Sequence, residues 1–239
     1  MIRFENVTKI FGKDFKAVDS LNLEVNEGKI YGFLGPNGAG KTTTLKMLTG
    51  ILSPDEGKIN INGYDIEENP NEAKREFAFV SDDPDLFLKL KGIEYLRFIG
   101  KVYQIEELDL KEKIFKYSEI FEMKDVLNDR IESYSHGMKQ KINIIGALIH
   151  SPKIWILDEP LTGLDPKSSH TLKQMMREHV DNGNIVLFST HVLEVAEKIC
   201  DHVFIINNGK IIFDGGLEEL KTKKDDSLEK IFLELVDHE

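Results

Sequence analysis

Apolar and polar residues alternate over residues 1–30, for example at Leu21, Leu23 and Val25, which is the period of half-buried antiparallel strands. Residues 29–34 are more continuously apolar, as expected for a strand that is covered on both faces. The pattern therefore predicts an antiparallel β-layer at the N-terminus, followed by a buried strand.

The buried strand leads into a glycine-rich loop and then into a predicted helix. Leu45, Leu48 and Leu52 have helical spacing, which predicts a helix over residues 42–52. A strand, a loop and a helix in this order are typical of an α/β nucleotide-binding fold.

Residues 86–150 are rich in Lys and Glu and show helical spacing, so we interpret them as a helical insert. Three later apolar runs, separated by helical patterns, predict that a parallel sheet resumes; they cover residues 154–157, 185–188 and 203–206. We expect one domain over 1–239, with a nucleotide-binding core (1–85 and 151–216), the insert (86–150) and a helical tail (217–239).

The tail shows a single apolar stripe behind Ser227, a candidate helix N-cap. The stripe consists of Leu228, Ile231, Phe232 and Leu235. Docking onto the core is the favoured interpretation, because such stripes are ordinarily core. A contact within a dimer is the alternative.

Composition narrows the class of protein. The chain has one cysteine, no stretch of about 18 apolar residues that would predict a membrane-spanning helix, and an N-terminus that resembles a strand more than a signal segment. We therefore expect a cytosolic protein. A net charge of -11 without clustered Lys and Arg argues against nucleic acid as a partner.

Residues 35–42 read Gly-Pro-Asn-Gly-Ala-Gly-Lys-Thr, the phosphate-loop pattern, and they lie between a predicted strand and a predicted helix. Backbone N–H groups of such a loop surround a polyphosphate, and glycine permits the close approach. Lys41 would contact the outer phosphates and Thr42 would bind Mg²⁺. The predicted nucleotide-binding residues here are Gly35, Pro36, Asn37, Gly38, Ala39, Gly40, Lys41, Thr42 and Thr43.

Two carboxylates, Asp158 and Glu159, end the apolar run 154–157. The carboxyl edge of an open α/β sheet is where such folds bind their ligands, so both acids should face the phosphate site. Asp158 suits the Mg²⁺ shell, and Glu159 could polarise the water that attacks the terminal phosphorus. Taken alone, a strand that ends in two acids is equally compatible with a solvent-facing turn.

Together, these segments resemble the ATP-binding cassette (ABC) family from about Phe4 to Gly216. Residues 134–140, Tyr-Ser-His-Gly-Met-Lys-Gln, are similar to the family's signature loop, which is normally Leu-Ser-Gly-Gly-Gln. The resemblance implies that Ser135, His136 and Gly137 reach ATP held by a partner subunit. Here His136 stands where the family has Gly, and this variant resembles those of single-cassette exporter subunits. Considered alone, Ser135 would be a helix cap.

Two more segments match the family. Residues 161–165, which end at Asp165, correspond to its inter-subunit loop, so Asp165 is predicted to act in trans. His191 closes the next apolar run and matches the switch histidine, which would contact the terminal phosphate and the attacking water. The resemblance assigns catalysis to Glu159, His191 and Lys41.

Two assignments leave alternatives open. Phe11 occupies the place where the family stacks an aromatic ring on adenine, with Phe15 as a nearby competitor. Asp82 aligns with the family's Gln, with Asp83 one residue away, and we hypothesise that Asp82 is a Mg²⁺ ligand. An acidic loop that favours the start of the next helix is the alternative for Asp82.

The predicted fold class is α/β: a P-loop NTPase core, mostly parallel and flanked by helices, with an antiparallel N-terminal β-layer and an inserted helical subdomain. The resemblance implies an ATPase that uses ATP and Mg²⁺ and forms a homodimer, or a heterodimer with a related cassette. It also implies a separate integral-membrane permease subunit, which would hold the protein at the inner face of the cell membrane, with export favoured over import. A soluble non-transport ABC ATPase and a nucleotide-gated regulatory module are the rival interpretations.

Overall fold

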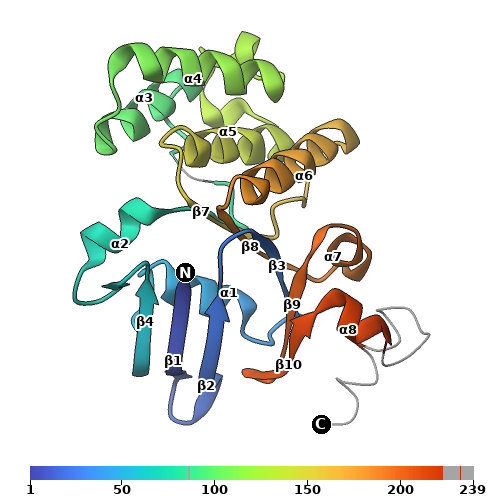
Figure 1. The fold of residues 1–239 in the computed structure, drawn as a ribbon. Coiled ribbons are helices and arrows are strands. Elements are labelled where there is room, and N and C mark those ends of the chain that lie inside the picture. Colours follow the sequence, from blue (N-terminus) through green and yellow to red (C-terminus); the bar gives the residue numbers. More distant parts are fainter. Residues whose placement is uncertain (86, 223–231, 233–239) are drawn as a thin grey trace.

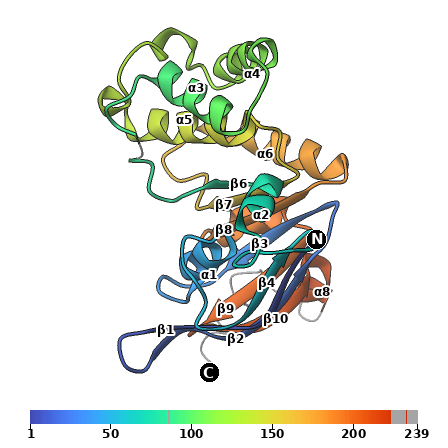
Figure 2. The ribbon, with the colours of Figure 1, turned by 90° about the vertical axis from the view of Figure 1, so that its left-hand side faces the viewer.

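The computed structural model describes residues 1–85, 87–222 and 232. Two sheets stand beside each other in the lower half of Figure 1, and helices α3, α4 and α5 lie at the opposite end of the molecule. Figure 2 shows the same separation from the side: the helical part lies at the end away from β1 and β2. The predicted fold class is confirmed by this architecture.

The first sheet is antiparallel and has the strand order β2-β1-β4-β5. Its strands are β1 (Ile2–Phe11), β2 (Phe15–Val25), β4 (Glu56–Ile61) and β5 (Tyr64–Asp65). Ile2 pairs with Val25 and Phe4 with Leu23, so the alternating apolar side chains fall on one buried face. The alternation in the sequence therefore predicted this layer correctly.

The second sheet has the order β10-β9-β3-β8-β7-β6. Its strands are β3 (Lys29–Leu34), β6 (Phe77–Val80), β7 (Ile154–Asp158), β8 (Ile185–Thr190), β9 (His202–Asn207) and β10 (Lys210–Gly216). All pairs are parallel except β9 with β10. The three apolar runs predicted after the insert are β7, β8 and β9.

Helices cover the second sheet and connect its strands. They are α1 (Lys41–Leu48), α2 (Pro70–Glu76), α3 (Gly92–Val102), α4 (Glu107–Ile120), α5 (His136–Leu148), α6 (Pro166–Asp181), α7 (Leu193–Ile199) and α8 (Leu217–Thr222), with two 3-10 turns at Lys124–Val126 and Ile131–Ser133. The helix predicted to reach residue 52 ends four residues earlier. Gly50, at a φ of 66°, supplies the left-handed conformation that terminates helices.

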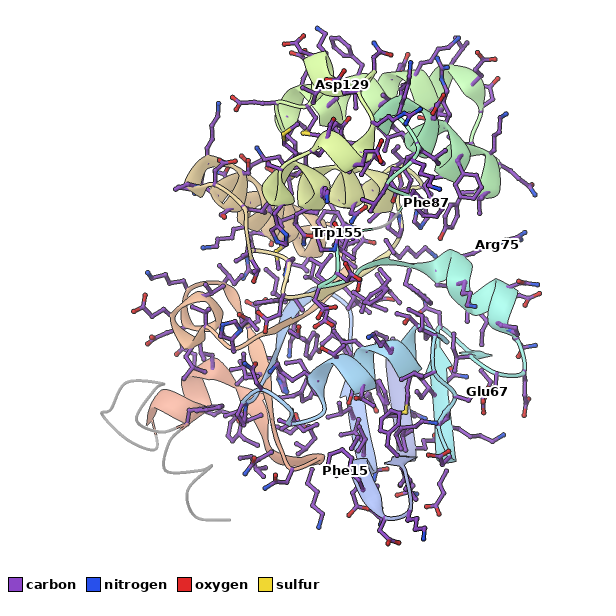
Figure 3. All side chains as sticks on the ribbon, turned by 180° about the vertical axis from the view of Figure 1, so that it is seen from behind. Phe15, Glu67, Arg75, Phe87, Asp129 and Trp155 are labelled. Carbon is purple, nitrogen blue, oxygen red and sulfur yellow. The ribbon has the colours of Figure 1, made fainter. Side chains whose placement is uncertain are left out.

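The second sheet separates two apolar cores, because alternate residues of its strands point to opposite faces. Ile154 and Ile156 of β7 join α1 and the antiparallel sheet in one core. Trp155 and Leu157 join α3, α4, α5 and α6 in the other, and Figure 3 shows Trp155 between the sheet and α5. The two cores hold the carboxyl ends of β3, β7 and β8 in fixed positions relative to one another.

The predicted tail is only partly described. Helix α8 begins it, and Phe232 is half-buried against the larger core. Ser227, Leu228, Ile231 and Leu235 lie outside the described residues. Among the helices that the structure describes, none combines the length and apolar character needed to cross a bilayer.

Candidate functional site

The glycine-rich loop joins the end of β3 to the start of α1, with Gly40 as the N-cap of the helix. Gly40 has a φ of 110°, and a Cβ on it would overlap the carbonyl oxygen of Ala17 in β2. A Cβ on Gly35 would overlap the carbonyl oxygen of Ile206 in β9. Neighbouring strands therefore press against the loop so closely that these two positions require glycine.

Lys41 is buried, and its Nζ donates to the carbonyl oxygens of Gly35 at 2.7 Å and Pro36 at 3.1 Å. Burial lowers the pKa of Lys41, while the negative charges of Glu159 and Asp158 act in the opposite direction. The ammonium group thus lies inside the curve of the loop, near both acids. The Lys41 ammonium group can therefore stay inside the loop and exchange its two carbonyl oxygen partners for phosphate oxygens.

Asp158 is fully buried at the end of β7, where it pairs in parallel register with Ser189 of β8. Its Oδ1 accepts a hydrogen bond from the Ser189 hydroxyl, and the Thr42 hydroxyl is close enough to lower the pKa of this carboxyl. Burial raises the pKa of Asp158, and the hydrogen bonds from Ser189 and Thr42 partly offset this effect. Its Oδ2 is buried without a hydrogen-bond partner among the described residues.

An orphaned buried carboxylate oxygen beside a threonine hydroxyl fits Mg²⁺, which prefers oxygen ligands and usually keeps several waters. No group of three or more His, Cys, Asp or Glu side chains in residues 1–85, 87–222 and 232 is arranged to hold an ion. One or two carboxylates are sufficient for Mg²⁺ when substrate phosphates complete the shell. Asp158 and Thr42 therefore fit the metal that the family implies.

Glu159 follows Asp158 with a φ of 46°, an uncommon value for a residue other than glycine. Its N–H donates to the Ser189 hydroxyl at 3.0 Å, and its Oε1 lies 2.9 Å from Nδ1 of His191. A carboxylate can only accept, so Nδ1 of His191 carries the proton and Nε2 remains to interact with a ligand. The strained backbone turns Glu159 toward the histidine that follows β8.

The loop that follows β6 brings Asp82 near the buried acid, since the charge of Asp82 contributes to the raised pKa of Asp158. Asp82 is exposed and accepts from the Ser81 hydroxyl at 3.2 Å. The Asp83 carboxylate instead accepts the Asp85 N–H at 3.0 Å within the loop. Of the two candidates, Asp82 is the one whose charge contributes to the raised pKa of Asp158.

The signature-like segment begins α5. Ser135 is the N-cap, and its hydroxyl accepts from the Met138 N–H at 3.3 Å, so the cap interpretation holds in the free chain. The exposed His136 ring packs against Gly163. A Cβ on Gly137 would come within 2.6 Å of the Gly163 carbonyl oxygen. This segment and the loop after β7 therefore form one tightly packed surface.

Asp165 uses its carboxylate within its own chain. It caps α6 by accepting from the Ser168 N–H at 2.9 Å, and it forms an ion pair with Lys141 of α5 at 2.7 Å. The bond from Lys141 is the main reason that the pKa of Asp165 lies well below its ordinary range. The predicted contact of Asp165 with a partner subunit stays a prediction.

Both candidate adenine-stacking rings lie on the β1–β2 hairpin, where Phe11 pairs with Phe15. Figure 3 shows Phe15 at the tip of this hairpin. Phe11 is 41% exposed and Phe15 is 64% exposed. The carbonyl oxygen of Ala17, two residues after Phe15, lies against Gly40, so the end of the hairpin that carries both phenylalanines is close to the phosphate loop.

Sequence reasoning missed two residues that organise the site. Ser189 holds both acids, and Lys141 holds Asp165. Ser189 had a usable signal, since it stands two residues before His191 at the end of a predicted parallel strand. Lys141 had none, because its partner is 24 residues away on a different element.

The parallel sheet, the phosphate loop and the acids at the neighbouring strand end define the chain as a P-loop nucleotide-binding protein. A family model described as "ABC transporter" matches residues 18–162. The chain belongs to this family and is an ATP-binding subunit of an ABC transporter.

Curated relatives and a solved structure agree with this assignment. The ABC transporter ATP-binding protein NatA of Bacillus subtilis (strain 168) is 35% identical over 97% of this chain and 93% of its own length. The bacitracin transport ATP-binding protein BcrA of Bacillus licheniformis is 36% identical over 96% of this chain and 74% of its own. A structure described as the ATP binding subunit of an ABC transporter is 31% identical, with a TM-score of 0.93 and coverage of 98% and 99%.

Proposed function

We propose that this chain hydrolyses Mg-ATP in a two-subunit assembly and thereby drives export through a separate integral-membrane permease subunit. The observation that carries the hydrolytic part is the cluster of Lys41, Asp158, Glu159 and His191 around one strand edge, in which Glu159 is oriented by His191. The export direction is supported by the signature variant and by a relative named Nod factor export ATP-binding protein I, which is 34% identical over 92% of this chain.

The proposed roles within one subunit combine this geometry with the family resemblance. Lys41 neutralises charge on the outer phosphates, and Phe11 stacks on adenine. Glu159 accepts a proton from the attacking water, and the His191 ring fixes the orientation of Glu159 and presents Nε2 to the terminal phosphate. Asp158, Thr42 and Asp82 would hold Mg²⁺, which when bound neutralises charge that develops on the phosphates.

The second subunit would complete the site. Ser135, His136 and Gly137 lie at the start of α5, where unpaired N–H groups favour an anion. In a dimer of two such chains, homomeric or with a related cassette, this segment would cover ATP bound by the other subunit. We also propose the division into a core (1–85 and 151–216), an insert (86–150) and a tail (217–239), and a location at the inner face of the cell membrane through the permease.

The experiment compares Glu159→Gln with the wild type by size-exclusion chromatography with light scattering, with and without Mg-ATP, and measures turnover of both. We expect the variant to be a monomer that becomes a stable dimer with ATP, and to lose turnover at least a hundredfold, since the proton acceptor is lost. Glu194→Gln, an acid on α7 with no assigned role, is the matched control. A variant that stays monomeric and retains full turnover would refute the assignment of Glu159.

A further inference from the structure

Helix α5 makes four polar side-chain contacts with other segments within its first two turns. They are Lys139 with Asp85 at 2.7 Å, Gln140 with the Pro160 carbonyl oxygen at 3.4 Å, Lys141 with Asp165 at 2.7 Å, and Asn143 with the Pro84 carbonyl oxygen at 3.2 Å. The helix is thus fixed to the loop after β6 on one side and to the loop after β7 on the other.

Two of these contacts hold the loop after β6. The Lys139 side chain is 16% exposed although it carries a full charge, and among the described residues its ion-pair partner is Asp85. Asn143 is buried, and its side-chain amide donates to the carbonyl oxygen of Pro84, the residue before Asp85. The Asp85 N–H is bound by Asp83, which stiffens the loop between Asp82 and the ion pair.

The ion pair between Lys139 and Asp85 also lies close to the signature segment, which begins at Ser135. The N–H of Lys139 donates to the Ser135 carbonyl oxygen at 2.9 Å, so Lys139 is one helical turn from the segment offered to a partner's ATP. Asp85 is three residues from Asp82, and Asp82 follows β6, which pairs in parallel with β7 so that Val80 lies opposite Leu157, the residue before Asp158. A rigid helix and a short braced loop therefore connect Asp82 with Ser135 through one ion pair.

We propose that Lys139 is a positioning residue: its ion pair with Asp85 links the Mg²⁺ side of a subunit's own ATP site to the loop that the same subunit presents to its partner's ATP. This inference rests on the proposed function, because it concerns how the two sites of a dimer communicate. Breaking the ion pair lets α5 and the loop after β6 move independently, so ATP bound in one site no longer favours closure over the other.

A merely structural role would lower stability and leave this communication intact. Lys113 and Asp109 on α4 form a matched pair for comparison: their distance is 2.8 Å and their side chains are 23% and 48% exposed, against 16% and 54% for Lys139 and Asp85. A partly exposed ion pair of this kind contributes little to stability, so neither Lys139→Met nor Lys113→Met should prevent folding.

The test places Lys139→Met, Asp85→Asn, their combination and Lys113→Met in the Glu159→Gln chain, and measures the ATP concentration that gives half-maximal dimer. Each broken ion pair should raise this ATP concentration about threefold. A dimer of two variant chains carries two broken pairs, so its half-maximal ATP concentration should rise about tenfold. The monomer's affinity for a fluorescent ATP analogue should not change. In chains with Glu159 intact, we expect turnover to depend sigmoidally on ATP in the wild type and less steeply in the Lys139→Met and Asp85→Asn variants.

The combination distinguishes a pair from two separate effects. If Lys139 and Asp85 act through each other, the double variant is no worse than either single variant. Additive effects, or a Lys139→Met chain that dimerises like Lys113→Met, would overturn the inference. Asp85→Asn alone decides the question should Lys139→Met fold poorly. Failure of the Glu159→Gln parent to dimerise with ATP would instead refute the proposed function.

Discussion

The phosphate-loop region and the signature segment differ in how completely one chain builds them. Lys41 and Asp158 are buried, and each is held by groups of the same chain. Ser135 and His136 are exposed at the start of α5. The residues proposed to bind phosphate and metal, which we call the phosphate-loop half, are therefore held within one chain, whereas the signature half, residues 135–137, is an open surface. The difference favours the proposed dimer, in which a second subunit would supply what each one lacks.

The largest effect is expected when a residue of the phosphate-loop half is removed. Lys41→Ala should weaken ATP binding and turnover roughly a hundredfold, because a buried, charge-assisted contact to phosphate is lost. The signature segment would remain intact but would have no ligand to cover. A fluorescent-nucleotide titration and a phosphate-release assay measure both effects.

Lys46→Ala is the control for that variant, since Lys46 lies on the same helix α1 and has no assigned contact with the site. Normal ATP affinity in Lys41→Ala would show that the loop binds phosphate through backbone N–H groups alone, and the role given to Lys41 would be wrong.

Gly137→Ala should disrupt the signature half and leave the phosphate-loop half unchanged. Its Cβ would lie 2.6 Å from the Gly163 carbonyl oxygen, so α5 must shift against the loop after β7. Crowding of this kind costs about 1–3 kcal/mol, and we expect ATP-driven dimerisation to weaken about thirtyfold. The ATP affinity of the monomer should stay the same. Light scattering across an ATP titration in the Glu159→Gln chain measures the first quantity.

Glu132→Ala, an exposed residue just before the segment, controls for nonspecific surface effects. Loss of monomer ATP binding in Gly137→Ala would contradict the separation of the two halves, since the change would then have reached the phosphate loop.

The comparison also shows what a sequence can predict. The phosphate loop and the acid pair are runs of consecutive residues whose chemistry depends on local order, so their place at strand ends was predicted. The contacts that hold them depend on register between strands: Asp158 meets Ser189 because β7 and β8 are aligned in parallel. Neither residue carries that alignment in its local sequence.

The signature segment was harder to predict for the same reason. Taken alone, Ser135 would be a helix cap, and it is one in the structure. Its contact with ATP of a partner subunit stays a prediction. Asp165 was predicted to act across a dimer, whereas the structure also gives it a cap and an ion pair within its own chain. The ion pair between Lys139 and Asp85 joins residues 54 positions apart. Packing between distant elements decides such contacts.

A smaller effect concerns the β1–β2 hairpin beside the phosphate loop, which carries the proposed adenine-stacking ring. Phe11→Ala should weaken ATP binding several-fold, about 1 kcal/mol, the lower end of base-aromatic stacking values, because the ring is already 41% exposed. Phe15→Ala is the matched variant on the same hairpin. The titration used for Lys41→Ala applies. A loss confined to Phe15→Ala would move the stacking role to that ring.

A further effect concerns acid stability rather than ATP binding, and it distinguishes the two ends of α5. His136 begins the helix and is exposed, whereas His150 follows its end, stacks on Tyr103 and has Nε2 3.2 Å from the Phe77 carbonyl oxygen. Burial lowers the pKa of His150 to about 4, and the nearby charge of Lys113 acts in the same direction. His150 therefore stays neutral in the fold at pH values where an unfolded chain is protonated.

Between pH 6.5 and 4 the unfolded state binds the extra proton, so the free energy of unfolding should fall as the pH falls. Above pH 6.5, His150 is neutral in both states and does not lower the free energy of unfolding. Below pH 6.5, one such histidine lowers this free energy by at most about 1.4 kcal/mol per pH unit. His150→Gln keeps an N–H donor for Phe77 and cannot titrate, so its stability should depend less on pH. Urea unfolding at pH 7.5, 6.5 and 5.5 tests this, with His136→Gln as the exposed control. An identical slope in wild type and His150→Gln would show that the acid sensitivity arises elsewhere, such as His179, whose pKa burial also lowers to about 4.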